Sequence, residues 1–165
     1  MENRERKTKE YIQNTLLFCA EALSRCEVKT LPEEDFSLIR HRVIPSFCYD
    51  NSFMSAVTLN ASAIVYGAAI INTRGQDLPV EHAWVKMRDG TYVDPTYQLL
   101  SENKPPPLDV RYYALFEVPT LKYVELAESL GNHLGDIVAM DFSWLRKSNK
   151  HKHLFSTTRK NSDPL

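Results

Sequence analysis

Cys48, His82 and Asp94 are the three residues whose types and order could carry nucleophilic chemistry. A thiolate is a strong nucleophile, an imidazole can take the thiol proton, and a carboxylate can hold that imidazole in one tautomer. We expect Cys48 in the first turn of a helix, where free amides and the positive end of the helix dipole favour an anion. The same amides can stabilise the oxyanion that forms when a carbonyl is attacked. Together the three residues predict a thiol enzyme.

The turn after the strand that bears His82 decides whether this histidine can meet Asp94. A two-residue loop at 89–90 would place the two side chains on opposite faces, because side chains alternate along strands. A three-residue loop at 88–90, with Gly90 in the left-handed region, makes them diagonal neighbours with backbones roughly 7–8 Å apart. We therefore predict the three-residue loop or another bulged loop of the same parity. Pro95 should then end the pairing, which places Asp94 at the rim of the sheet.

The other segments predict helices first and then a run of antiparallel strands, which is the order of an α+β fold rather than of alternating βαβ units. Helices are predicted at residues 3–26, from Cys48 with Ser46 as N-cap, and from Pro119 to a stop at Gly131. Strands are predicted at residues 63–71, 80–87, 91–94 and 111–118. Residues 133–145 are ambiguous, with a last strand at 137–142 as one option.

Three segments resemble the core of the transglutaminase-like cysteine-enzyme superfamily, which is related to papain. They are CYDNS (48–52), EHAWVKM (81–87) and GTYVDPTY (90–97), and the resemblance covers about a third of the chain. It implies a papain-like α+β fold, in which the Cys-bearing helix packs on an antiparallel sheet, and a catalytic triad of Cys48, His82 and Asp94. No Gln or Trp lies just upstream of Cys48 to stabilise an oxyanion, so its backbone amide is the candidate donor and a second donor is not identified.

The triad implies a thioester acyl-enzyme formed by attack on an amide bond of a protein or peptide. Peptidase, amidase or deamidase, and acyltransferase activities all stay open, because water and amines can resolve the same intermediate. Trp84, Asn51 and Tyr49 are the predicted substrate-binding residues. Trp84 shares a strand face with His82, so it could shield the ion pair or simply belong to the core. Asn51 could contact the substrate or a nearby backbone group.

Two other functions stay open at this point. A catalytically silent binding module would keep the scaffold and use the same cleft to hold a partner. An acetyltransferase of the arylamine type has the same order of Cys, His and Asp, although the run Val93–Thr96 fits the transglutaminase-like core better.

The composition fits one folded domain, because 43% of the 165 residues are hydrophobic and 25% are charged. We expect a single transglutaminase-like domain at 1–145 and a basic, flexible tail at 146–165. That tail could be solvated or could act as a weak partner-binding arm. A net charge of −1 argues against a dedicated nucleic-acid binder. No apolar run approaches ~20 residues, and MENRERKTKEY lacks the apolar core of a signal peptide, so we expect a cytoplasmic protein without a membrane span.

Three cysteines, Cys19, Cys26 and Cys48, argue against a disulfide framework, because the number is odd and no secretory signal is present. Cys19 falls on the apolar stripe of the predicted first helix, which indicates a packing role. The sequence contains no C-x-x-C pair, no glycine-rich nucleotide-binding motif and no paired histidines on a helix face. We therefore expect neither a metal nor a cofactor.

Overall fold

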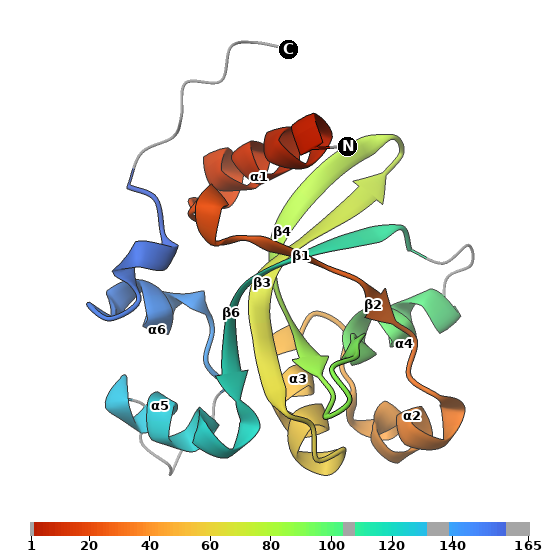
Figure 1. Ribbon diagram of the computed structural model, residues 1–165. Coiled ribbons are helices and arrows are strands. Elements are labelled where there is room, and N and C mark those ends of the chain that lie inside the picture. Colours follow the sequence, from red (N-terminus) through yellow and green to blue (C-terminus); the bar gives the residue numbers. More distant parts are fainter. Residues whose placement is uncertain (1, 104–107, 132–138, 158–165) are drawn as a thin grey trace.

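A mixed sheet organises the part of the chain that the computed structural model describes, residues 2–103, 108–131 and 139–157 (Figure 1). In the order β1-β6-β3-β4-β5-β2, its strands are β1 (Ser24–Cys26), β6 (Val110–Pro119), β3 (Ala63–Thr73), β4 (Gln76–Lys86), β5 (Tyr92–Val93) and β2 (Val28–Lys29). Every pairing is antiparallel except that of β2 with β5, so the prediction of an antiparallel sheet is wrong at this edge. The chain enters β2 directly from β1, without a turn that would reverse its direction.

Helices surround the sheet and make the fold α+β, as the sequence predicts. They are α1 (Glu2–Leu16), α2 (Glu33–Ile39), α3 (Cys48–Thr58), α4 (Pro95–Asn103), α5 (Tyr123–Ser129) and α6 (Phe142–Lys147). Short 3-10 turns are η1 (Ala20–Ala22), η2 (Arg40–Arg42), η3 (Thr120–Lys122) and η4 (Lys152–Leu154). Among the described residues, no helix is long and apolar enough to cross a membrane.

A single stretch of chain joins the two edges of the sheet. β1 pairs with β6 at one edge and β2 pairs with β5 at the other, yet only Glu27 separates β1 from β2. Figure 1 shows this stretch crossing the long central strands on its way from α1 to α2. Residues 24–29 therefore cross one face of the sheet, where Cys26 and Val28 pack against a buried cluster that includes Trp84 and Tyr112.

The two faces of the sheet bury different side chains, because residues alternate along each strand. The α3 face, on which α3 packs, buries aliphatic residues and a tyrosine, namely Ile64, Tyr66, Ala68, Ile70 and Val85. The opposite side, which we call the His82 face, buries Val65, Ala69, Trp84, Tyr112 and Ala114 beneath β2 and α4. Cys48 begins α3, which packs on one face, whereas His82 lies on the other face. The candidate triad therefore combines residues from both sides of the sheet.

The first helix is shorter than the predicted range of residues 3–26. α1 ends at Leu16, Leu17 adopts a left-handed conformation with a φ of +59°, and residues 24–26 form β1. The side chain of Gln13 accepts a hydrogen bond from the amide of Ala20 at 3.0 Å, which fixes the chain after it leaves the helix. No glycine or proline marks this break in the sequence, so the helical periodicity gave no sign of it.

The segment predicted to be a basic tail starts inside packed structure. Arg146 belongs to α6, pairs with Glu81 and donates a hydrogen bond of 3.1 Å to the carbonyl of Leu16. Phe155 forms a β-bridge with Phe18. Residues 158–165 of that segment lie outside the described residues. The optional strand at 137–142 lies partly outside them too, and its last residue, Phe142, begins α6.

Candidate active site

The hairpin between β4 and β5 has the predicted three-residue loop. Val85 pairs with Val93, so Met87 faces Thr91 across the loop, and the Met87 amide donates to the Thr91 carbonyl at 2.8 Å. Gly90 has a φ of +86°, a conformation that glycine adopts without a steric penalty. The predicted parity is confirmed, and it places His82 and Asp94 on the same face.

His82 and Asp94 form a buried pair. The imidazole Nε2 lies 2.7 Å from Asp94 Oδ2, and each residue is 3% exposed. The other carboxylate oxygen, Oδ1, accepts hydrogen bonds from the amides of Thr96 at 3.0 Å and Tyr97 at 3.2 Å. Asp94 therefore caps α4, with Pro95 at the first helical position. The sequence predicts the run Asp-Pro-Thr to be a strand end, but this run also has the form of a helix start.

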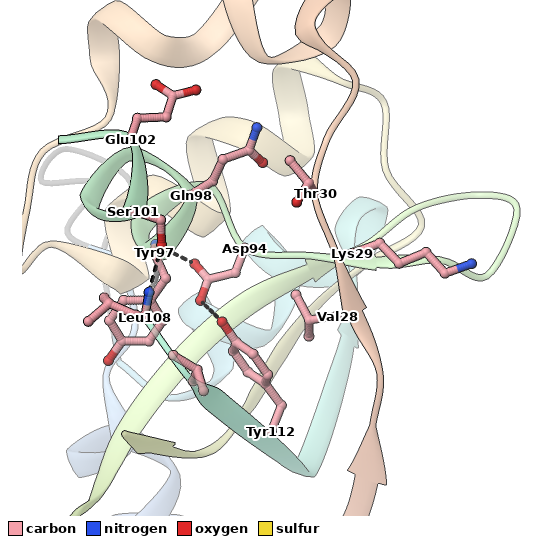
Figure 2. Close-up of a pocket in the computed structure, with 11 residues that line it drawn as sticks. Val28, Lys29, Thr30, Asp94, Tyr97, Gln98, Ser101, Glu102, Leu108 and Tyr112 are labelled. Carbon is pink, nitrogen blue, oxygen red and sulfur yellow. Dashed lines mark hydrogen bonds between the residues drawn. The ribbon is translucent and has the colours of Figure 1, made fainter. Parts of the chain in front are cut away.

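Tyr112 on β6 is a third partner of this pair that the sequence analysis missed. Its hydroxyl donates to Asp94 Oδ2 at 2.8 Å (Figure 2), and His82 Nε2 faces the same oxygen. Burial, and then the charge of Asp94, raise the pKa of Tyr112 far above its usual value, so the hydroxyl stays protonated. No motif marks Tyr112, and only its register opposite Ala69 places it on the His82 face.

Aromatic rings enclose the imidazole of His82. The ring of Tyr97 stacks on it with centroids 4.4 Å apart, and the ring of Trp84 lies roughly parallel at 6.2 Å. Trp84 shares the face of His82, as the sequence predicts, but it is completely buried. It therefore shields the imidazole from water and does not reach a substrate in this structure. Gly67 makes this packing possible, because an added Cβ would lie 2.7 Å from Trp84 Cη2.

Cys48 is the first residue of α3 and is half-buried. The helix N-cap is Phe47, not the predicted Ser46, which instead adopts a left-handed φ of +70°. Phe47 has no side-chain acceptor, so it leaves the first amides of α3 without a cap. These amides, including that of Cys48, are thus available to an anion next to the thiol.

The electrostatics of His82 connect the carboxylate and the thiol. Burial would lower the pKa of His82, but the charge and hydrogen bond of Asp94 raise it, and the hydrogen bond and charge of Cys48 raise it further, to about 9. Since Nε2 faces Asp94, the other ring nitrogen, Nδ1, is the one left for the Cys48 thiol. An imidazolium between a carboxylate and a thiolate is the arrangement that makes a cysteine nucleophilic near neutral pH.

Asn51 joins α3 to the chain that precedes it and to the start of α4. It is 2% exposed, its Oδ1 accepts from the Ile44 amide at 3.0 Å, and its Nδ2 donates to the Ile44 carbonyl at 2.8 Å. The same Nδ2 also donates to Thr96 Oγ1 at 3.0 Å. Of the two interpretations left open by the sequence, the structure places Asn51 in contact with backbone, where it holds the chain before Cys48 against the start of α4.

Tyr49, the remaining predicted substrate-binding residue, is half-buried on the α3 face. Its ring stacks on Tyr66 with centroids 6.0 Å apart and meets Phe142 edge-on at 6.2 Å. The other two cysteines lie apart from the triad, since Cys19 caps η1 and Cys26 lies in β1. Within residues 2–103, 108–131 and 139–157, no group of His, Cys, Asp and Glu side chains could hold a metal ion.

A cavity of about 370 Å³ opens behind Asp94, between α4 and β2 (Figure 2). Asp94 and Tyr112 line it together with Tyr97, Val28 and Lys29, among others. Cys48 and His82 do not line this cavity, so it approaches the triad from the carboxylate side.

The chain matches no protein-family model, no curated protein sequence and no solved structure.

Proposed function

We propose that this protein is a thiol enzyme that acts on amide bonds of a protein or peptide through a Cys48–His82–Asp94 triad. The observation that carries the proposal is one buried imidazole bonded at Nε2 to Asp94, at 2.7 Å, and lying close enough to Cys48 for that side chain to raise its pKa. In this function Cys48 is the nucleophile, His82 is the general base and acid, and Asp94 holds the ring in its productive tautomer.

The first half of the reaction forms an acyl-enzyme. Nδ1 of His82 takes the proton of Cys48, and the thiolate attacks the carbonyl carbon of the substrate amide. The C–S bond forms, and the oxyanion lies beside the uncapped first amides of α3. His82 then gives its proton to the amide nitrogen, the C–N bond breaks, and the amine leaves a thioester on Cys48.

The second half releases the acyl group. Water or a primary amine gives a proton to His82 and attacks the thioester carbonyl, and the C–S bond breaks as Cys48 leaves as a thiolate. Water makes the enzyme a hydrolase, and an amine makes it an acyltransferase. Both routes restore the thiolate–imidazolium pair, so the triad serves either reaction.

The arrangement of elements supports a transglutaminase-like core, which we propose as the relationship of this fold to papain. The Cys48 helix packs on β3 and β4, His82 lies on β4, and Asp94 follows β5 directly. These are the positions that the resemblance of the segments at 48–52, 81–87 and 90–97 implies for the three residues.

The rate of alkylation by iodoacetamide tests the nucleophile. Near neutral pH we expect Cys48 to react much faster than Cys19, which is also half-buried but whose thiol, at η1, donates to the Glu21 carboxylate at 3.2 Å. Peptide mapping by mass spectrometry identifies the labelled residue, and Cys48→Ala is the control that removes the fast phase. Equal, slow labelling of all three cysteines would instead favour a catalytically silent binding module.

Intact-mass analysis tests the acyl-enzyme. With p-nitrophenyl acetate as the acyl donor, we expect an acetyl adduct on the wild-type protein and none on Cys48→Ala. Adding methylamine then separates the two routes, because a transferase yields N-methylacetamide while a hydrolase yields acetate. Absence of any adduct on a protein whose Cys48 alkylates rapidly would contradict the acyl-transfer step.

A further inference from the structure

One carboxylate oxygen serves two donors at the centre of the site. Asp94 Oδ2 lies 2.7 Å from His82 Nε2. The same oxygen lies 2.8 Å from the hydroxyl of Tyr112, the contact that Figure 2 shows. The second oxygen, Oδ1, is occupied by the amides of Thr96 and Tyr97, so the carboxylate cannot turn to separate the two donors without uncapping α4. His82 and Tyr112 must therefore share one oxygen.

Sharing an acceptor changes how strongly each donor is held. A hydrogen bond from a neutral hydroxyl spreads the negative charge of a carboxylate and stabilises it, which is worth more in a buried site than in water. The hydroxyl of Tyr112 thereby weakens the attraction of Asp94 for a proton on His82. Tyr112 is 6% exposed, so water does not readily replace its hydroxyl at Oδ2.

We propose that Tyr112 is a positioning residue of the triad, whose hydroxyl shares Asp94 Oδ2 with His82 and so sets how firmly the imidazole keeps its proton. This inference rests on the proposed function, because it assigns Tyr112 a role through Asp94 and His82 rather than through contact with the substrate. It adds to the triad a fourth side chain, contributed by β6.

Other ionisable groups also lie near His82 and Asp94, and a test by pH must take them into account. Cys48 approaches from α3, the hydroxyl of Tyr97 comes from α4, and Lys29 of β2 lines the cavity that reaches Asp94. Glu81 precedes His82 on β4 but is paired with Arg146. Burial raises the pKa of Tyr97, and the charges of Asp94 and Cys48 raise it further, so this phenol stays neutral in the working range.

The rate at which iodoacetate, a negatively charged reagent, alkylates Cys48 depends on whether His82 is protonated. An imidazolium beside Cys48 attracts this reagent, so the rate rises as the thiolate forms and falls as the imidazolium loses its proton. For the wild-type protein we expect that fall near pH 9, the pKa of His82. In Tyr112→Phe the fall should move upward by about one pH unit, because Asp94 then holds the His82 proton more tightly.

Tyr123→Phe is the matched control. Tyr123 is also a buried phenol, 2% exposed, but its hydroxyl bonds Tyr66 and the Met140 amide rather than Asp94. We expect this variant to keep the wild-type profile. Site-specific replacement of Tyr112 by 3-fluorotyrosine keeps the ring and the fold and makes the hydroxyl a stronger donor. The alkylation rate should then decrease at a lower pH than in the wild-type protein.

The outcomes separate this inference from the proposed function. A bell-shaped wild-type profile that neither Tyr112 variant moves, relative to Tyr123→Phe, would overturn the role of Tyr112 and leave the triad intact. A wild-type profile without the alkaline fall would overturn the thiolate–imidazolium pair itself. Should Tyr112→Phe fail to fold, the direction of the shift in the fluorotyrosine protein decides the question alone.

Discussion

Each face of the sheet buries a hydrogen-bonded network built on two rings, Tyr66 with Tyr123 on one face and Tyr112 with His82 on the other, but the two networks end on different groups. On the α3 face, the Tyr66 hydroxyl donates to the Met140 carbonyl at 2.8 Å, and the Met140 amide donates to Tyr123 at 2.6 Å. On the His82 face, Tyr112 donates to Asp94, which also holds the imidazole. A network that ends on neutral backbone groups stabilises the fold, whereas one that ends on a carboxylate and an imidazole also responds to pH.

Of the substitutions considered, the removal of the negative charge of Asp94 should change the reactivity of Cys48 most. In Asp94→Asn the cap of α4 can persist, since Asn is as good an N-cap as Asp. Burial then lowers the pKa of His82 without opposition from the carboxylate, the imidazole becomes neutral, and most of the thiol stays protonated. The alkylation rate of Cys48 by iodoacetamide at pH 7 should fall by about tenfold or more.

Asp141→Asn provides the matched control for that prediction. Asp141 also caps a helix, α6, and its side chain accepts from the Ser143 amide at 2.8 Å. The same substitution there should leave the reactivity of Cys48 unchanged. Equal losses in the two variants would mean that Asp94 acts only as a cap.

Gly67 tests how tightly the His82 face is packed. A Cβ at this position would overlap the Tyr113 carbonyl oxygen and come within 2.7 Å of Trp84 Cη2. Gly67→Ala should therefore lower the free energy of unfolding by about 1–3 kcal/mol and slow the alkylation of Cys48, because Trp84 packs against His82. Urea denaturation and the iodoacetamide rate measure the two effects.

Gly75→Ala, in the turn of the same β3–β4 hairpin, is the comparison. Nothing lies within 4 Å of a Cβ there, and only the φ of +82° opposes the substitution. We expect a cost of about 1 kcal/mol and no change in Cys48 reactivity. If Gly67→Ala behaved in the same way, the close contact with Trp84 would not matter to the site.

The pH dependence of stability should distinguish the two faces directly. The folded-state pKa of His82 is about 9, above the ordinary value of 6.5, so its contribution is fully present below pH 6.5 and is lost as the pH rises through 9. The loss is at most about 3 kcal/mol. Urea denaturation of the wild type and of His82→Gln should show a difference that shrinks over this range, and a constant difference would contradict the pairing.

Asn51 links the two faces, and its removal should have the smallest effect. Asn51→Ala leaves the Ile44 amide and carbonyl without their partner and breaks the bond from α3 to Thr96 of α4. We expect a loss of about 1–2 kcal/mol in unfolding free energy and a modest decrease in Cys48 alkylation. Ser37→Ala, on exposed α2, should change neither quantity and serves as the control.

The sequence was sufficient for the parts of the site that local rules determine. Turn chemistry at Gly90 determined the register of β4 and β5, and with it the meeting of His82 and Asp94. The start of α3 at Cys48 and the strands β3 to β6 followed from local patterns, whereas β1 and β2 were not predicted. These features depend on residues that are close together along the chain, so a single sequence is enough to predict them.

Long-range pairing accounts for the parts that the sequence did not reveal. Tyr112 meets Asp94 only because β6 pairs with β3 and places Tyr112 opposite Ala69. The break after Leu16 reflects the pairing of β1 with β6, not a local stop signal. The sequence left open whether Trp84 and Asn51 bind substrate or are structural, and it did not reveal that both are buried, because exposure depends on which elements cover a residue.

The stretch that joins the two sheet edges also constrains the order in which the chain can fold. Residues 24–29 are synthesised early, but β1 has no partner until β6 has been made, and β2 has none until β5 has been made. Such distant contacts form late, because a long loop must close first. Tyr112 lies on β6 too, so a nascent chain contains Cys48 early and completes the environment of the candidate triad last.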